Sequence, residues 1–342
     1  MDMNQPQGFP KKQGIVDMPP FDLPISIYMS QEAGQAFIEK RARVTEFGTS
    51  SNENLRETTD RHFWTPLLEK AQARYSTHVE KKLISGIPTF VTTPDRIAEQ
   101  YADCVLINLH GGSFELGNGG LGSMVESIPI AAVSQFKVIS IDYRQSPEHR
   151  FPAASEDVAA VYRELLKTYK PENIGIYGCS AGAILTSGSM AWFIKEQLPL
   201  PGAIGLFCAG ADPRYGGDSR FITSPQCFDT PIITDGTNPP PLLPGYRTYF
   251  EAADLRDPLV SPALSPETLR KFPPTLLISG TRAYDLSSAA YTHTRLRKLG
   301  VETELYVWDG MWHGFHYDVD LPESREVFDI AAEFFRSKLA QR

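Results

Sequence analysis

Short apolar runs alternate with longer amphipathic segments from about residue 83 to the end of the chain. Six such runs have the length of a strand and no polar alternation, at residues 104–109, 137–141, 174–177, 203–208, 275–279 and 304–308. Runs of this kind predict strands that are covered on both faces. Segments between them carry apolar residues at helical spacing. Strands that alternate with helices predict an α/β fold, with a mainly parallel central sheet flanked by helices.

Two segments do not follow this alternation. Residues 1–60 are mostly polar, with one weakly periodic helical stretch at 31–43. Residues 212–257 are rich in Pro, Gly and Thr and are long for a bare loop in a compact domain. They are either a mobile insertion or the short helices of a cap, one of them over residues 246–253. We therefore expect an N-terminal cap segment at 1–60 and a main domain at 61–342, with an insertion at about 212–257.

Composition narrows the class of protein. Apolar residues make up 42%, charged residues 22%, and the net charge is −8, which disfavours a nucleic-acid partner. No apolar stretch is long enough for a membrane span, and the N-terminus lacks the apolar core of a signal peptide. The four cysteines show no CxxC spacing, so we expect reduced thiols in a cytoplasmic protein rather than a disulfide framework or a metal cluster.

A Gly-x-Ser-x-Gly motif follows the third apolar run, where residues 178–182 read GCSAG. Between an expected strand and an expected helix, this motif is typical of a nucleophile elbow. A serine on such a tight turn projects its Oγ, and the first helical N–H groups can face developing negative charge. The motif alone also fits a helix start without chemistry. Ser180 is therefore the candidate nucleophile.

A His-Gly-Gly turn follows the first apolar run, where residues 110–114 read HGGSF. Acyl transfer passes through an oxyanion that needs backbone N–H donors held in place, and glycines leave such amides uncovered. The amides of Gly111, Gly112, Ser113 and Ala181 are the candidate oxyanion hole. A plain glycine turn is the alternative, since further glycines follow. The absence of a Gly-Lys-Ser/Thr ending rules out a phosphate-binding P-loop.

The candidate base and acid come from later loops. His313 and His316 both follow the last apolar run, and His313 is favoured because it comes sooner after the strand. His316 then remains an ordinary loop histidine. Asp285 is the only carboxylate in residues 280–286, after the preceding run, and would hold the histidine in its correct tautomer. Its other interpretation is an N-cap for the following helix.

Residues 142–157 read DYRQSPEHRFPAASED and resemble the D-Y-R-L-A-P-E-H-x-F-P-A-A-x-E-D stretch of the hormone-sensitive-lipase-like α/β-hydrolases, the bacterial carboxylesterases. With the three motifs above, the resemblance covers about residues 80–340. It implies an α/β-hydrolase fold with a mainly helical cap. It also implies that the 142–157 stretch braces the oxyanion loop, so Glu156 and Asp157 are supporting groups. In the family the cap shapes an acyl pocket, and the candidate pocket aromatics are Phe21, Phe37, Phe114, Tyr215 and Tyr246, each of which also fits ordinary core packing.

The sequence departs from the family pattern in three of its motifs. Ser113 replaces the last glycine of H-G-G-G, and in G-D-S-A-G-G Cys179 replaces the aspartate and Ala183 the last glycine. The family register places the acid at Ala283, two positions before Asp285. A shifted loop, a dyad or another carboxylate would each account for this last departure.

These residues predict a serine carboxylesterase that hydrolyses short-to-medium acyl or aryl esters through an acyl-enzyme, with no cofactor and no metal. A small-molecule ester is the expected partner, and the resemblance implies a homodimer through the last strand and helix. The alternatives are an amidase, a lactonase or another specialised hydrolase on the same fold, and a non-catalytic homologue that binds a small ligand. The presence of both Ser180 and His313 favours an enzyme, and the lack of repeats disfavours a scaffold.

Overall fold

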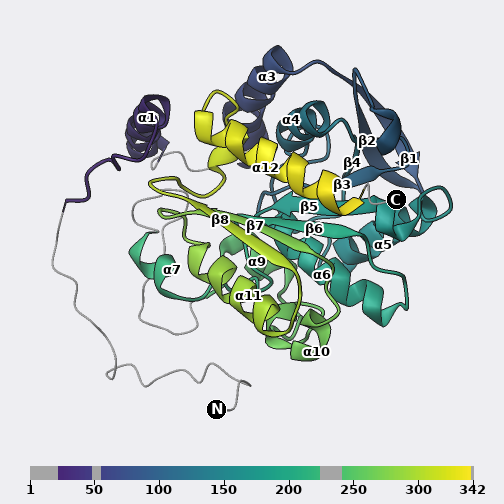
Figure 1. The fold of residues 1–342 in the computed structure, drawn as a ribbon. Coiled ribbons are helices and arrows are strands. Elements are labelled where there is room, and N and C mark those ends of the chain that lie inside the picture. The colour runs from purple at the N-terminus through teal and green to yellow at the C-terminus, as the bar shows by residue number, and fades with distance from the viewer. Residues whose placement is uncertain (1–21, 48–54, 224–240, 340–342) are drawn as a thin grey trace.

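The computed structural model describes residues 22–47, 55–223 and 241–339, and its centre is one eight-stranded sheet (Figure 1). The strand order is β1-β2-β4-β3-β5-β6-β7-β8. The strands span β1 Thr77–Ile84, β2 Ile87–Pro94, β3 Val105–Leu109, β4 Lys137–Ile141, β5 Ile174–Cys179, β6 Ala203–Phe207, β7 Thr275–Gly280 and β8 Thr303–Trp308. β1 pairs antiparallel with β2 and β2 antiparallel with β4, whereas every other pair is parallel. The expected α/β fold with a mainly parallel sheet is confirmed.

The six strands that the sequence predicts are present, each with its bounds within two residues of the expected ones. The hairpin of β1 and β2 was not predicted. β1 lies at the edge of the sheet with most of its side chains exposed, and its sequence THVEKKLI lacks a buried apolar run. Ser85 and Gly86, at the turn of this hairpin, both have positive φ angles. An exposed charged edge strand therefore gives little of the periodic signal on which the prediction depends.

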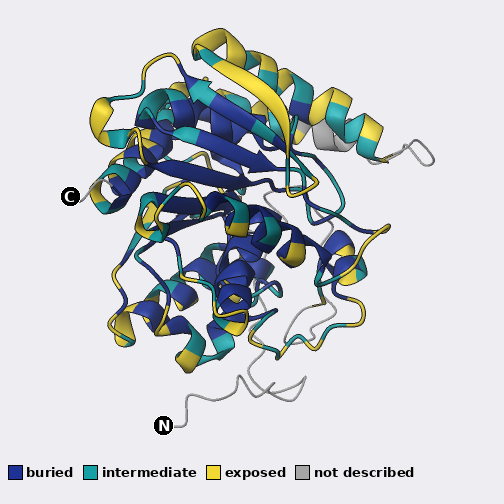
Figure 2. Cartoon of the chain, turned by 90° about the vertical axis from the view of Figure 1, so that its right-hand side faces the viewer, coloured by how far each residue is buried: buried dark blue, intermediate teal, exposed yellow. Residues whose placement is uncertain are grey.

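Helices cover both faces of the sheet, and the central strands are buried between them (Figure 2). α4 (Met124–Ser134) and α12 (Pro322–Leu339) pack on one face with α3 (Thr65–Arg74) beside them. α5 (Ala153–Leu165), α6 (Ala181–Lys195) and α11 (Leu286–Lys298) cover the other. Two apolar cores result, one on each side of the sheet, as expected for parallel strands without polar alternation.

The remaining elements are short, apart from the N-terminal helix. They are α1 Gln31–Phe47, α2 Leu55–Thr59, the π-helix η1 Asp60–Trp64, η2 Glu99–Tyr101, η3 Pro171–Asn173, α7 Asp218–Ile222, α9 Pro244–Tyr249, η4 Pro262–Leu264, α10 Pro266–Leu269 and η5 Phe315–Tyr317. The described parts of the 212–257 insertion thus hold the short helices α7 and α9, in keeping with a mainly helical cap. No helix in the described ranges combines the length and the apolar character needed to cross a bilayer.

The N-terminal helix α1 docks against the loop after β8 and against α12. Phe37 is buried, and its ring lies 5.9 Å from that of Trp312. The backbone N–H and the hydroxyl of Ser30 donate hydrogen bonds to the buried Glu323 carboxylate at 2.7 and 2.9 Å. The N-terminal segment is therefore fixed to the part of the chain that carries His313.

Candidate active site

Ser180 occupies a strained turn between β5 and α6. Its backbone has φ 57° and ψ −117°, outside the regions that non-glycine residues favour. A Cβ added to Gly178 or Gly182 would lie 2.1 or 1.7 Å from the carbonyl oxygen of Leu109, so glycine is required on both sides. The sharp turn leaves the Ser180 Oγ at the carboxyl edge of the sheet, in the geometry of a nucleophile elbow.

His313 and Asp285 complete a hydrogen-bonded chain that begins at Ser180. The His313 Nε2 lies 3.0 Å from the Ser180 Oγ, and its Nδ1 lies 2.6 Å from the Asp285 Oδ1. Asp285 is fully buried, and its other oxygen accepts a hydrogen bond from the Ser279 hydroxyl at 2.6 Å. These three residues follow β5, β7 and β8, and the carboxyl ends of these strands meet at one edge of the sheet.

The structure decides between the sequence alternatives for the neighbouring residues. Asp285 precedes α11, yet its side chain caps no helical N–H, because both carboxylate oxygens are directed to Ser279 and His313. Ala283 is buried in the turn just before it. His316 points elsewhere, and its Nε2 lies 3.0 Å from the Glu126 carboxylate in the interior.

The His-Gly-Gly turn lies directly beside the elbow. A Cβ on Gly111 would be 3.5 Å from the Ser180 Cβ, and Gly112 has a φ of 115°. Ser113 follows with a φ of 59°, so this non-glycine residue also adopts the left-handed region. Within the described residues, no acceptor is bonded to the N–H of Gly112 or Ser113. The N–H of Ala181 at the start of α6 likewise has no hydrogen-bond acceptor among the described residues.

The loop that carries these amides is held from behind. The Tyr143 hydroxyl donates to the carbonyl oxygen of His110 at 2.7 Å, and the two rings stack at 4.2 Å. Burial lowers the pKa of His110, which favours its neutral form in this stack. Arg144 donates its Nε and its backbone N–H to the buried Asp157 carboxylate. The stretch after β4 thus braces the oxyanion loop, and Asp157 supports it at a distance from the Ser180 hydroxyl.

Comparison with known proteins gives the family. Residues 106–317 match the family model described as alpha/beta hydrolase fold. An acetyl-hydrolase of Streptomyces hygroscopicus is 30% identical over 234 residues, which are 68% of this chain and 75% of that protein. The chain belongs to the α/β-hydrolase family.

Solved structures place this α/β-hydrolase within the family. Esterase E25 has a TM-score of 0.80 and 31% identity, covering 96% of this chain and all of that one. An esterase from the bacterial hormone-sensitive lipase family has a TM-score of 0.74 and 25% identity, over 91% of this chain and 99% of that one. Family, fold and relatives together identify a carboxylic ester hydrolase of the hormone-sensitive-lipase-like type.

Three tyrosines surround the reacting groups of this hydrolase. The Tyr246 hydroxyl lies 3.4 Å from the Ser180 Oγ and 2.7 Å from the Tyr215 hydroxyl, and the Tyr284 hydroxyl lies 3.0 Å from the His313 Nε2. Burial raises the pKa of Tyr215 and Tyr246 well above the ordinary value, so both stay neutral. We call Tyr215, Tyr246 and Tyr284 the tyrosine cluster.

The sequence named two members of the tyrosine cluster only as candidate pocket aromatics and missed the third. Tyr284 stands in the segment with Asp285, but no local pattern distinguishes it from a core residue. Of the other suggested pocket aromatics, Phe114 stacks on Tyr249 at 4.3 Å and lines a small apolar cavity with Ile184 and Leu185. Phe37 packs on the N-terminal side, away from that cavity. Phe21 lies outside the described residues.

Proposed function

We propose that this chain is a serine carboxylesterase in which Ser180 is the nucleophile, His313 the general base and Asp285 the acid that orients it. The observation that supports these roles is the continuous hydrogen-bonded chain from the Ser180 Oγ through both nitrogens of His313 to Asp285. A fixed Nδ1–H to a buried carboxylate leaves the Nε2 lone pair for the serine proton. No cofactor is needed for this reaction.

The reaction proceeds through an acyl-enzyme. The Ser180 Oγ attacks the ester carbonyl carbon while the His313 Nε2 takes the hydroxyl proton. The carbonyl oxygen becomes an oxyanion that accepts hydrogen bonds from the N–H groups of Gly112, Ser113 and Ala181. Gly111, which has no side chain, lets the backbone of this loop lie close to Ser180. The imidazolium returns the proton to the leaving alcohol. Water then attacks the acyl-enzyme with the same histidine as base, which releases the acid and restores Ser180.

The proposed substrates are short-to-medium acyl or aryl esters. Two members of the tyrosine cluster, Tyr246 and Tyr284, stand within hydrogen-bond distance of the nucleophile and the base, which leaves little room for a bulky acyl group beside them. The side chains around the small cavity next to Phe114 and Tyr249 are mostly apolar, which favours an apolar acyl group of modest size over a polar one. The relative named acetyl-hydrolase agrees with the short end of this range.

The test is hydrolysis of p-nitrophenyl acetate, butyrate and octanoate by the wild type and by Ser180→Ala. We expect turnover that declines from butyrate to octanoate, and a loss of about 10⁶-fold in kcat for Ser180→Ala. Ser189→Ala is the matched control, because Ser189 is also a buried serine but lies inside α6, away from the turn that carries Ser180. An unaffected Ser180→Ala, or a wild type inactive on all three esters, would contradict the proposal.

The proposal also covers the division of the chain into a cap and a catalytic domain, its oligomeric state and its location in the cell. Residues 1–60 and the insertion at about 212–257 form the cap, and residues 61–342 form the catalytic domain. A homodimer through β8 and α12 is supported by the outer position of β8 and its half-exposed Tyr306 and Val307. Light scattering after gel filtration should give twice the chain mass, and Val307→Glu should reduce the measured mass to that of one chain.

A cytoplasmic location is supported by the three described cysteines, which form no disulfide.

A further inference from the structure

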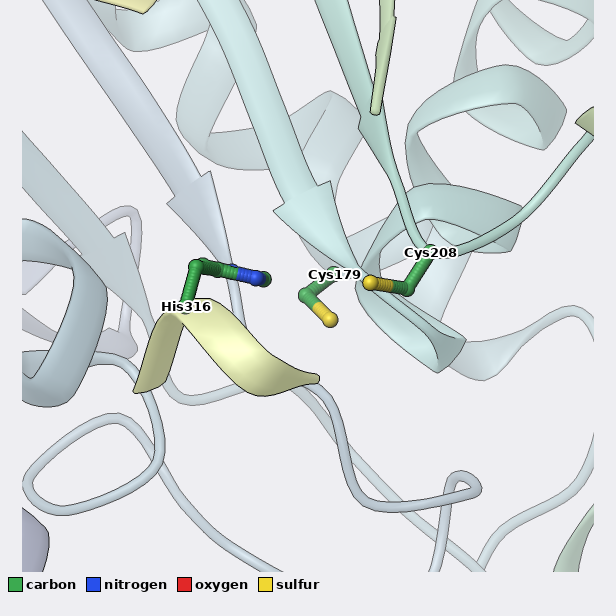
Figure 3. A group of neighbouring side chains, drawn as sticks. All are labelled: Cys179, Cys208 and His316. Carbon is green, nitrogen blue, oxygen red and sulfur yellow. The ribbon is translucent and has the colours of Figure 1, made fainter. Parts of the chain in front are cut away.

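Two thiols and an imidazole converge beneath the nucleophile, on the side of the elbow away from its Oγ. Cys179, Cys208 and His316 are completely buried. The two sulfurs and one ring nitrogen all lie within 4.8 Å of one another. Figure 3 shows the three side chains pointing toward a common centre. We call them the buried thiol–imidazole cluster.

The topology of the sheet produces this cluster. Cys179 ends β5 and Cys208 directly follows β6, which is the parallel neighbour of β5. Successive side chains of a strand point to opposite faces, so Cys179 points away from the Ser180 hydroxyl. His316 comes from η5, in the loop after β8. Three segments far apart in the sequence thus meet at one point, which is why no CxxC spacing marks the cluster.

Glu126 holds the His316 ring in the orientation that a metal ligand requires. The Glu126 carboxylate is fully buried in α4, and its Oε1 lies 3.0 Å from the His316 Nε2. Among the described residues, the His316 Nδ1 is buried and makes no hydrogen bond of normal geometry, although the ring interacts with the Cys208 thiol. Histidines that bind metals usually donate one ring N–H to a carboxylate, which leaves the other nitrogen for the ion.

We propose that Cys179, Cys208 and His316 bind a thiophilic divalent cation, with zinc as the best fit and Glu126 as the residue that positions the imidazole. Zinc takes thiolate sulfur at about 2.3 Å and imidazole nitrogen at about 2.0–2.1 Å, so tetrahedral ligand atoms lie roughly 3.7 Å apart. The three side chains therefore need only small rotations. Two thiol protons leave to solvent, the thiolates neutralise the cation, and a water takes the fourth position.

A second trio nearby is a poorer site. The Cys208 sulfur also lies within 4.8 Å of a His313 nitrogen and an Asp285 oxygen. That nitrogen and that carboxylate are already bonded to each other or to Ser180 and Ser279, so neither has a free position for an ion. The His316 Nδ1 does, which favours the buried thiol–imidazole cluster.

The bound ion would have a structural role. It would join the ends of β5 and β6 to the loop that carries His313, where the N–H of Gly314 already donates to the Cys208 sulfur at 3.3 Å. Because the three segments meet only in the folded chain, the ion binds the folded state and raises its melting temperature.

The experiment uses the full chain, with Cys227→Ser as background because Cys227 lies outside the described residues. The protein is produced in zinc-supplemented medium so that the buried site can fill during folding, and it is purified without a tag under reducing conditions. Metal content is measured by mass spectrometry. A second preparation, made with cobalt, is examined for the absorption of a cobalt–thiolate bond. We expect about one zinc ion per chain and a clear cobalt–thiolate band.

Variants locate the ion. Cys208→Ser and Cys179→Ser should each abolish the stoichiometric zinc and weaken the cobalt–thiolate band. Glu126→Gln, which keeps the side-chain shape, should lower the zinc affinity about 10- to 100-fold. Cys104→Ser is the control, because this buried thiol is directed to the Leu339 carbonyl oxygen and should leave binding unchanged. Circular dichroism checks the folding of each variant.

Two results would overturn the proposal. One is a folded wild-type protein with neither stoichiometric zinc nor a cobalt–thiolate band after production in supplemented medium. The other is a folded Cys208→Ser protein that binds zinc as tightly as the wild type. The first result depends on no variant, so a substitution that prevents folding does not remove the test.

Discussion

Asp285 reaches the histidine from a position two residues later than the family register implies. The backbone turn through Ala283 is buried, and the carboxylate is held between Ser279 and His313. A buried carboxylate with two hydrogen bonds and no helix-capping bond has the geometry of an orienting acid. Which residue lies beside His313 thus depends on the direction of its side chain, and the spacing of residues along the sequence does not determine that direction.

Asp285→Asn tests this residue directly. The amide keeps the shape but favours the wrong tautomer of His313, so kcat should fall about 10⁴-fold while the fold is retained. Steady-state kinetics with p-nitrophenyl butyrate measures this effect. Asp309→Asn is the control, since Asp309 lies on the neighbouring loop and, among the described residues, accepts hydrogen bonds from Thr281 and Ser26 rather than from His313. Equal activity of both variants would argue for a dyad or for another carboxylate.

At the scale of elements, the oxyanion loop depends on backbone conformations that ordinary residues avoid. Gly112, Ser113 and Phe114 follow one another with positive φ angles. A Cβ on Gly112 would lie 2.0 Å from the Leu116 carbonyl oxygen, and that turn sets the direction of the next two amides. Ser113 adopts a positive φ that glycine usually provides, so we expect its backbone N–H to serve where the family motif has its third glycine.

Gly112→Ala should therefore move the amides away from the oxyanion position. We expect kcat to fall about 10²- to 10³-fold, the loss typical of one missing oxyanion donor. Gly300→Ala is the matched control, because Gly300 also has a positive φ of 80° but has open space where the Cβ would lie. Gly300→Ala should lower the free energy of unfolding by about 1 kcal/mol and leave kcat unchanged. Kinetics and thermal unfolding of both variants separate backbone strain from catalysis.

The sequence was most informative where one element carries its own signal. Continuous apolar runs predicted β3 to β8, and the GCSAG motif predicted the turn at Ser180. β1 was not predicted, because an exposed edge strand shows no regular pattern of apolar residues. The sequence also did not predict the tyrosine cluster or the pairing of His316 with Glu126, since their members come from separate segments. Contacts between distant segments depend on packing, which no local pattern encodes.

At the scale of the whole molecule, the N-terminal segment supports the site from outside the sheet. Phe37 packs against Trp312, the residue before His313, and Arg282 lies 4.9 Å above the Phe37 ring. Ser30 adds its hydrogen bonds to Glu323 at the start of α12. The cap segment and the histidine loop should therefore respond together when this contact is weakened.

Phe37→Ala should remove that contact. Truncation of a buried aromatic side chain costs about 3 kcal/mol of unfolding free energy, and kcat/KM should fall as the Trp312 loop loosens. Ile38→Ala is the control on the same helix, because the Ile38 side chain is half exposed and should change neither quantity. Urea unfolding followed by tryptophan fluorescence gives the stability of both variants, and steady-state kinetics gives their kcat/KM. A stable and fully active Phe37→Ala would show that α1 is dispensable for the site.

The order of the three proposed catalytic residues along the chain has a consequence for protein synthesis. Ser180 follows β5, Asp285 follows β7, and His313 follows β8, just before the final helix. A growing polypeptide carries its nucleophile first and lacks the base until the segment after β8 has been made. Products of premature termination would therefore contain an unactivated serine and hydrolyse nothing. Only a polypeptide that extends beyond His313 would become able to attack esters in the cell that makes it.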